Sequence, residues 1–189
     1  MRTAQLERTT KETEINLTLD LDGNGTAKVD TTLKFLDHML VLLAKHSQIN
    51  LELTAHGDLN HHLVEDIGIC LGQAFLKALG DKKGIERYGE ATIPMDEVLV
   101  QAALDFSGRT AICLDLKFKH PIVEDVSTED LIHFLQSFGE NARMNLHVRV
   151  LYGENDHHKI EGAIKALARA IKQAKKITSD EIMSTKGVL

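Results

Sequence analysis

A histidine doublet followed by a glutamate occurs twice in the sequence, and the side chains of both motifs could bind metal ions. HHLVED spans residues 61–66 and the related HHKIEG spans residues 157–162. On a helix, a histidine and a glutamate four positions apart lie one turn apart on the same face, where both can bind one ion. The second histidine of each doublet is rotated by about 100° around the helix axis. It is therefore predicted to point at a different ion.

The number and type of the candidate ligands favour two divalent ions. Six histidines and two glutamates are more than one ion can bind. Imidazole and carboxylate ligands without cysteine are compatible with Mn, Fe, Ni, Co or Zn. Because the histidines of each doublet diverge, assembly of the site from several subunits is a reasonable hypothesis. The candidate ligands are the two doublets with their glutamates and two histidines in matching helices: His61, His62, Glu65, His157, His158, Glu161, His38 and His133.

Two further features could complete an active site around such ions. Glu12 begins a predicted strand in a polar context, where it is either a general base or an ordinary surface residue. Guanidinium groups and backbone N–H donors match the oxygens of a phosphate, so basic residues could clamp one. The candidates for this clamp are Arg87, Arg109 and Lys186, with donors near Ser184 and Thr185.

The elements that must position these residues are arranged in two copies. Residues 97–109 match residues 12–24 with a constant offset of 85. Residues 144–162 match residues 49–66, with one extra residue before the doublet. A period of about 90 residues is too long for a solenoid and predicts two similar halves about a pseudo-twofold axis. Each half is predicted to run strand, strand, helix, strand, helix.

Local patterns predict the individual elements. Residues 14–21 alternate between polar and apolar side chains, as a half-buried strand does. DGNG at 22–25 predicts a hairpin into a second strand at about 26–34. Residues 35–46 have helical periodicity, as does the run after the first doublet, for which Gly80 is the expected C-cap.

The expected fold class is α+β, with four helices packed between two sheets. Residues 1–90 would form the first half-domain, and residues 91–189 the second half-domain with a C-terminal tail. The two halves would together form one domain. The polar, glycine-bearing segment 81–91 is the expected connector between them.

Composition and charge exclude several classes of protein. The 189 residues are 43% hydrophobic and 26% charged, which is typical of a soluble globular protein and not of a disordered one. The net charge of −6 argues against a nucleic-acid partner. No run reaches the roughly 18 apolar residues of a membrane span, and the N-terminus lacks an apolar signal segment. We therefore expect a cytoplasmic protein whose Cys70 and Cys113 are reduced core residues, with a disulfide as the minor alternative.

Six segments distributed along the chain carry a family resemblance: RTTKET at 8–13, FLDHML at 35–40, HHLVED at 61–66, DFSGR at 105–109, HHKIE at 157–161 and STKGVL at 184–189. They resemble the motifs of imidazoleglycerol-phosphate dehydratase, an enzyme of histidine biosynthesis, and the resemblance extends over essentially the whole chain. It implies two halves that arose by duplication, in agreement with the repeat. It also implies two manganese ions per active site and a homo-oligomer of 24 subunits built from trimers, with active sites between subunits.

The resemblance also assigns roles to residues. The eight candidate ligands fall on the metal-binding positions of the family, and Arg87, Arg109, Ser184 and Lys186 would hold the phosphate. The chain departs from the usual DDHHTVED pattern, because it has the shorter GDLNHHLVED with Leu63. This difference concerns the loop and the hydrogen bonds that support the ligands. With Thr185 from the clamp, the predicted substrate-binding residues are His46, Arg87, Arg109, Lys165, Ser184, Thr185 and Lys186, and the predicted catalytic residue is Glu12.

The implied reaction is the dehydration of imidazoleglycerol phosphate to imidazole acetol phosphate. Two ions on the ring nitrogens would stabilise an imidazolate, whose electrons expel the hydroxyl, while Glu12 removes the carbon-bound proton. Two other classes would use some of the same residues. A di-metal phosphoesterase would release inorganic phosphate, and a metal-storage protein would take up ions without forming a ketone.

Overall fold

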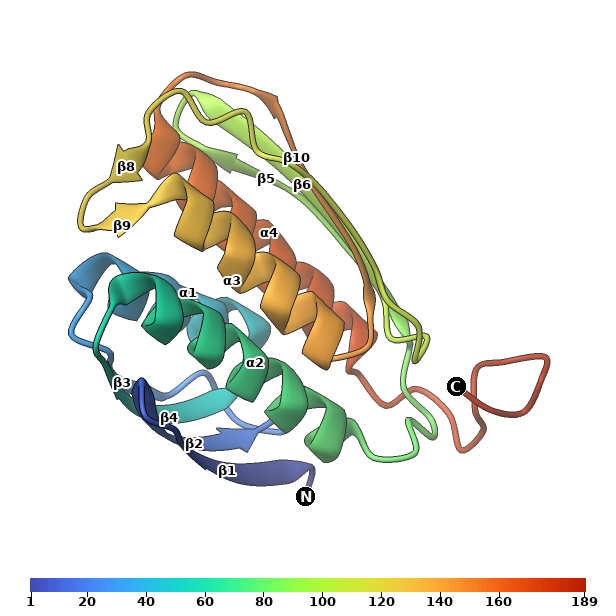
Figure 1. Ribbon diagram of the computed structural model, residues 1–189. Coiled ribbons are helices and arrows are strands. Elements are labelled where there is room, and N and C mark those ends of the chain that lie inside the picture. The colour runs from blue at the N-terminus through green and yellow to red at the C-terminus, as the bar shows by residue number, and fades with distance from the viewer.

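The computed structural model describes residues 1–189, and its four helices lie between two sheets (Figure 1). The expected α+β class is therefore confirmed. In chain order the elements are β1 (Thr3–Thr9), β2 (Thr13–Asp20), β3 (Ala27–Asp30), α1 (Lys34–Ser47), β4 (Asn50–Gly57), α2 (Asn60–Leu79), β5 (Tyr88–Met95), β6 (Val98–Asp105), β7 (Ala111–Asp115), β8 (Ile122–Val123), β9 (Val126–Ser127), α3 (Thr128–Asn141), β10 (Asn145–Tyr152) and α4 (Asp156–Ala174).

The two four-stranded sheets have equivalent strand orders, which confirms the duplication. The first sheet has the order β1-β2-β4-β3 and the second has the order β5-β6-β10-β7. In each sheet the last strand pairs in parallel with its neighbour, and all other pairs are antiparallel. β2 starts at Thr13 and β6 at Val98, so the offset of 85 residues in the sequence is also the offset of the strands.

Several local expectations differ from the structure. Each four-stranded sheet has one strand more than predicted, because β1 and β5 precede the alternating strands, and the second half also contains the short strands β8 and β9. The hairpin expected at residues 22–25 does not form. The strand β4 lies between β2 and β3 and takes the backbone hydrogen bonds that a hairpin between them would use. The division expected after residue 90 lies inside β5, which starts at Tyr88 and pairs with β6.

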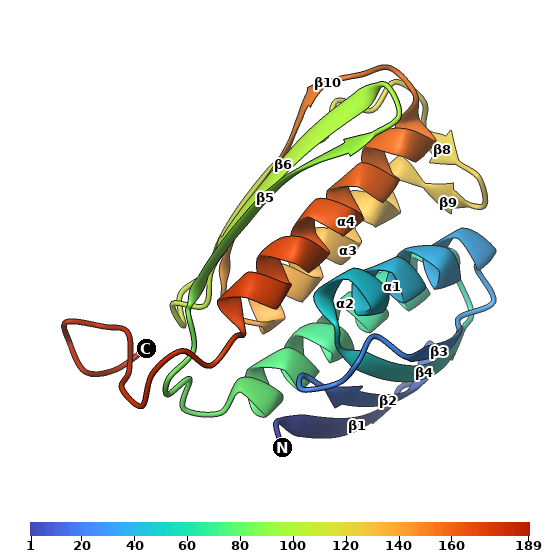
Figure 2. The ribbon, with the colours of Figure 1, turned by 180° about the vertical axis from the view of Figure 1, so that it is seen from behind.

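One hydrophobic core connects the two halves. In both views of the ribbon, the helices of the two halves face each other between the sheets (Figures 1 and 2). Apolar side chains alternate along the central strands and face the helices, as Ile15, Leu17 and Leu19 do on β2. Helices α1 and α2 cover the first sheet, α3 and α4 cover the second, and the halves meet where α2 packs on α3 and α1 on α4. Because the 52 buried apolar residues form a single cluster, neither half has a core of its own.

Two glycines allow α2 to approach α3 closely. A Cβ atom added at Gly72 would lie 2.6 Å from the carbonyl oxygen of Phe138 and 2.8 Å from the backbone nitrogen of Ala142. A Cβ atom at Gly68 would lie 2.9 Å from the carbonyl oxygen of Phe134. Any larger residue would force the helix axes apart, so these glycines set the distance between α2 and α3.

All four helices begin at the same end of the molecule (Figure 1). At this end His61 of α2 contacts Asp130 of α3 at 2.7 Å. Asp125, just before α3, accepts a hydrogen bond of 3.1 Å from the backbone N–H of Phe35 in α1. The Phe35 ring lies 5.0 Å from the ring of His157 at the start of α4. Four helix N-termini carry partial positive charges here, which favours the carboxylates gathered around them.

Two predictions about the helices and cysteines can be compared directly with the structure. Gly80 ends α2 with a φ of 57°, as expected for a glycine C-cap. Cys70 is buried in α2, but the prediction that Cys113 is a core residue is wrong. The residues of β7 alternate, so that Ile112 and Leu114 turn inward and Cys113 is exposed. Both thiols are free. None of the helices combines the length and apolar character needed to cross a membrane.

Candidate active site

Three predicted ligands face one another between α1 and α4, and we call them the first ligand group. Glu161 Oε2 lies 3.4 Å from His157 Nε2 and 4.0 Å from His38 Nε2. Adjacent donor atoms around an octahedral ion with bonds of about 2.1 Å lie about 3 Å apart. The separation of Glu161 from His157 is close to this spacing, whereas its separation from His38 is longer.

Two predicted substrate-binding residues lie beside this group. Lys165 Nζ is 2.6 Å from Glu161 Oε1. Burial opposes ionisation of Glu161, but the hydrogen bond and charge of Lys165, with the two neighbouring histidines, give it a lowered pKa. The carboxylate is therefore charged at neutral pH. Burial and the nearby Lys165 and Arg169 lower the pKa of His46, which keeps its imidazole neutral.

The second ligand group lies between α2 and α3, at the equivalent place in the duplicated fold. The rings of His61 and His133 are 5.0 Å apart, and Glu65 follows His61 by one helical turn. These three residues correspond to His157, His38 and Glu161 of the first ligand group. Each half of the chain therefore contributes a histidine doublet, and each doublet faces a histidine from the neighbouring helix.

The remaining histidine of each doublet points elsewhere, as the helical spacing predicted. The ring centroids of His61 and His62 are 6.3 Å apart, and those of His157 and His158 are 6.0 Å apart. His62 Nδ1 lies 3.8 Å from Glu12 Oε2, so the predicted base is next to the first doublet. In the chain as a whole, no set of three or more His, Cys, Asp or Glu side chains is arranged to hold a metal ion on its own.

The predicted phosphate-binding residues line one pocket of about 520 Å³. Arg87 organises it. Its guanidinium group donates two hydrogen bonds to Asp105, of 2.7 and 3.0 Å, and one of 2.8 Å to the carbonyl oxygen of Met183. This last bond holds the C-terminal tail against the second sheet. The pocket brings together all five predicted residues of the clamp, namely Arg87, Arg109, Ser184, Thr185 and Lys186.

The pocket lined by the predicted phosphate-binding residues, called the phosphate-binding pocket after that prediction, and the ligand groups lie at opposite ends of the molecule. The backbone N–H of Arg87 donates to the carbonyl oxygen of Ala174 at the end of α4, whereas His157 lies at its start. A helix of 19 residues is about 28 Å long at about 1.5 Å per residue. Glu12 lies at the histidine end, because its carbonyl oxygen accepts a hydrogen bond from Asp58. One small substrate therefore cannot contact both the histidines and this pocket of the same molecule.

A family model described as imidazoleglycerol-phosphate dehydratase matches residues 31–171. The chain belongs to this family. It is 50% identical to the imidazoleglycerol-phosphate dehydratase of Chloroherpeton thalassium, over 100% of this chain and 98% of that protein. It is also 50% identical to the imidazoleglycerol-phosphate dehydratase of Methanococcoides burtonii, over 100% of both chains.

Two solved structures of imidazoleglycerol-phosphate dehydratase have the same fold. The enzyme of Staphylococcus aureus gives a TM-score of 0.86 with 36% identity, over 93% of this chain and 99% of that chain. The enzyme of Pyrococcus furiosus, in complex with (S)-C348, gives a TM-score of 0.83 with 36% identity, over 97% and 100%. The predicted enzyme class, a hydro-lyase of histidine biosynthesis, is thereby confirmed.

Sequence analysis of this dehydratase missed the carboxylates that hold its doublet histidines. Each doublet histidine uses Nδ1 for a carboxylate, which leaves Nε2 available for a metal. Two of these contacts had a detectable signal, because Asp58 precedes His62 by one helical turn and Glu97 is the repeat counterpart of Glu12. The other two join residues far apart in sequence. The pairs are His61 with Asp130 (2.7 Å), His62 with Asp58 (2.9 Å), His157 with Glu124 (2.9 Å) and His158 with Glu97 (2.8 Å).

Leu63, which replaces the threonine of the usual family pattern, does not disturb the carboxylates that contact the doublet histidines. Leu63 is buried against Gly57 and faces the core, so it does not take the position of a hydrogen-bonding partner. The shortened loop still supplies Asp58, whose carboxylate holds His62. The side chain of Leu63 therefore packs in the core, and the shortened loop keeps its contact with His62.

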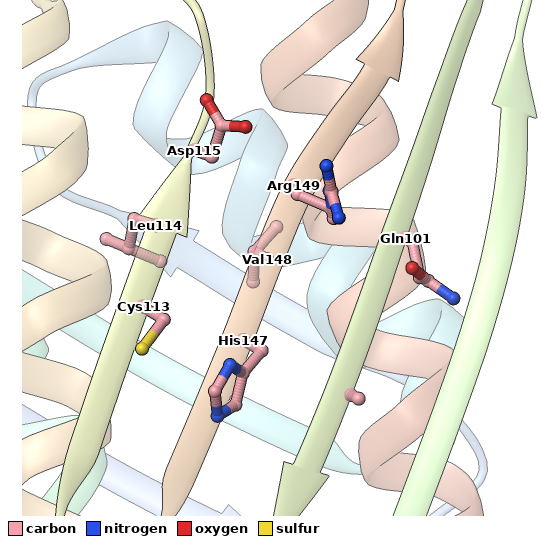
Figure 3. A pocket seen from close by; sticks show the side chains of 8 residues that line it. Gln101, Cys113, Leu114, Asp115, His147, Val148 and Arg149 are labelled. Carbon is pink, nitrogen blue, oxygen red and sulfur yellow. The ribbon is translucent and has the colours of Figure 1, made fainter.

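A separate pocket of about 350 Å³ lies on the outer face of the second sheet (Figure 3). Its lining includes Gln101 of β6, Cys113 of β7, and His147 and Arg149 of β10. None of the predicted site residues contributes to it. This pocket is therefore distinct from both the ligand groups and the phosphate-binding pocket.

Proposed function

We propose that this dehydratase converts imidazoleglycerol phosphate to imidazole acetol phosphate with two manganese ions per active site. The observation that carries the proposal is the pair of equivalent ligand groups, each built from one helix of either half and each offering two imidazoles and a carboxylate. A phosphate-binding pocket lined by Arg87, Arg109 and Lys186 in the same chain matches the other end of such a substrate.

The first ligand group, His38, His157 and Glu161, would contribute ligands to one ion. The second ligand group, His61, His133 and Glu65, would contribute ligands to the equivalent ion. His62 and His158 point away from these groups and would complete the coordination of ions bound by a neighbouring subunit. When bound, the ions supply Lewis acidity to the imidazole ring of the substrate.

Glu12 is the proposed base that removes the carbon-bound proton. Its carboxylate is 58% exposed and lies beside His62 at the histidine end of the chain. No lysine or arginine forms an ion pair with it, so its oxygens are free to accept a proton. A positioned carboxylate is an ordinary general base in enzymes.

We further propose that the active site lies between subunits of a homo-oligomer, with a 24-subunit assembly of trimers as the expected form. Two observations support a shared site. The ligand groups and the phosphate-binding pocket are separated by the length of α4, and no set of ligands in one chain suffices for an ion. A neighbouring subunit that presents its phosphate-binding pocket to these histidines would resolve both points.

The test is an assay for imidazole acetol phosphate with metal-free protein, before and after adding Mn²⁺, together with a measurement of particle mass by light scattering. We expect activity to be lost with the metal and restored by Mn²⁺. Unchanged activity after complete metal removal would contradict the proposal. Release of inorganic phosphate would indicate a phosphoesterase instead, and metal uptake without a ketone would indicate storage.

The variant Glu12→Gln distinguishes the role of the proposed base from that of the metal ligands. Loss of a general base lowers kcat by about 10²–10⁴-fold, whereas Mn²⁺ binding should be unchanged. Glu14→Gln is the matched control, because Glu14 is exposed on the outer side of β2 two residues away. Full turnover by Glu12→Gln would exclude Glu12 as the base.

A further inference from the structure

The hairpin formed by β8 and β9 is present in the second half of the chain only. In the first half, residues 31–33 connect β3 directly to α1. In the second half, the connection from β7 to α3 spans residues 116–127 and contains the hairpin. Figure 1 shows it beside the ends at which the helices begin. Its tip consists of Glu124 and Asp125.

The backbone at the tip is unfavourable for a glutamate. Val123 pairs with Val126, which leaves a two-residue turn between the strands. Turns of this kind need a positive φ at one or both central residues and favour glycine or asparagine there. Glu124 has a φ of 54° and carries a Cβ atom, which the left-handed region penalises.

The contact made by this glutamate gives little stability in return. Its Oε1 accepts a hydrogen bond of 2.9 Å from His157 Nδ1. The Glu124 side chain is 57% exposed and that of His157 is 35% exposed. Exposed pairs of this kind contribute little to the folding free energy. Stability alone therefore does not explain why a glutamate occupies this strained position.

The contact does decide which nitrogen of His157 is available. With Nδ1 bonded to Glu124, Nε2 is the free nitrogen, and it lies 3.4 Å from Glu161 Oε2 in the first ligand group. The adjacent Asp125 accepts a hydrogen bond of 2.7 Å from the backbone N–H of Lys34 at the start of α1. The hairpin tip therefore contacts both helices that carry the first ligand group.

We propose that Glu124 is a positioning residue that fixes the tautomer and orientation of His157 for metal binding, at the cost of backbone strain. This inference rests on the proposed function, because it requires His157 to be a metal ligand. It concerns the first ligand group alone, since the first half of the chain has no equivalent hairpin.

The test compares Mn²⁺ affinity with thermal stability in the intact protein. Glu124→Gly removes both the side chain and the strain, whereas Glu124→Ala removes the side chain alone. We expect both variants to bind Mn²⁺ about 10–100-fold more weakly by calorimetry, which is the usual effect of losing a residue that orients a ligand. Metal-free Glu124→Gly should nevertheless melt at a higher temperature than wild type, because its strain is relieved.

Arg143→Gly is the matched control. Arg143 follows α3, has a φ of 50° and is exposed, and its side chain makes no hydrogen bond or ion pair. This variant should also melt at a higher temperature but bind Mn²⁺ like wild type. Glu124→Gln keeps an acceptor oxygen for Nδ1–H and should lose about threefold or less in affinity.

Wild-type affinity in both Glu124→Gly and Glu124→Ala would overturn the inference while leaving the proposed function intact. If wild-type protein itself bound no Mn²⁺, the proposed function would fail, and the role of Glu124 would fail with it. A fall in affinity for Arg143→Gly as large as that for Glu124→Gly would also refute the role, because strain relief would then be the cause.

Discussion

Replacing Gly72 by alanine tests how closely α2 must approach α3. The new Cβ atom would lie 2.6 Å from the carbonyl oxygen of Phe138, which is 0.8 Å short of the 3.4 Å at which ordinary contacts begin. It would also lie 2.8 Å from the backbone nitrogen of Ala142. Both partners are backbone atoms of α3 or its end, so the collision is relieved only if the two helices separate.

The expected loss of stability follows from two opposing terms. Overpacking a core costs about 1–3 kcal/mol, and a collision with backbone belongs at about 3 kcal/mol. Alanine in a helix interior is favoured over glycine by about 1 kcal/mol. The net change in the free energy of unfolding is therefore a loss of about 2 kcal/mol. For a chain of this size, the melting temperature should fall by about 4–8 °C.

The assay is thermal unfolding of the metal-free protein followed by circular dichroism, with Gly139→Ala as the control. Gly139 lies in α3, and a Cβ atom there would meet the flexible Cδ1 end of Ile112. It should gain helix propensity without a backbone collision. Gly72→Ala should also weaken Mn²⁺ binding, because metal–ligand distances tolerate only about 0.2 Å and α2 carries His61. A melting temperature for Gly72→Ala equal to or above that of Gly139→Ala would refute this reasoning.

Three other perturbations test separate parts of the molecule. In native protein at pH 8, one thiol per chain should react with a thiol reagent, because Cys113 is exposed whereas burial raises the pKa of Cys70 to about 11. The Cys113→Ser variant should react only after denaturation in urea. Arg87→Lys replaces the guanidinium group that pairs with Asp105 by a single ammonium group. Loss of one charged hydrogen bond to the substrate phosphate, worth about 1.5–3 kcal/mol, should raise KM about 10–100-fold in steady-state kinetics, and an unchanged KM would contradict the role of Arg87 in the pocket. Asp125→Ala removes the hydrogen bonds that the Asp125 carboxylate accepts from the first backbone N–H groups of α1, and it should lower the free energy of unfolding by about 1 kcal/mol in urea titrations. An unaltered urea midpoint would show that these bonds do not stabilise the protein.

The repeat made the architecture predictable. Alternating apolar residues such as Ile15 and Leu17 fix which face of a strand is buried, and the same pattern 85 residues later fixes the second sheet. The divergence of the two histidines in each doublet was predictable, because helical spacing is a local property of the chain. Which histidine of the neighbouring helix each doublet faces was not predictable, because His38 and His157, like His61 and His133, lie far apart in sequence.

Long-range pairing was not predictable from local patterns. β1 has one fully buried residue, Ala4, and therefore lacks the alternating apolar signal of its neighbour. The turn residues at 22–25 were recognised, but the insertion of β4 between β2 and β3 depends on contacts distant in sequence. The same limit hid Glu124, whose partner His157 is 33 residues away and whose turn lacks the usual glycine.

The separation of the phosphate-binding pocket from the histidine doublets has a genetic consequence. If active sites are shared between subunits, a lesion at Arg109 disables the pocket that a chain offers to its neighbour, whereas a lesion at His62 disables the histidines. Two such defective alleles expressed in one cell should complement each other, because a mixed assembly contains some sites built from two intact ends. Two alleles with lesions at the same end should never complement.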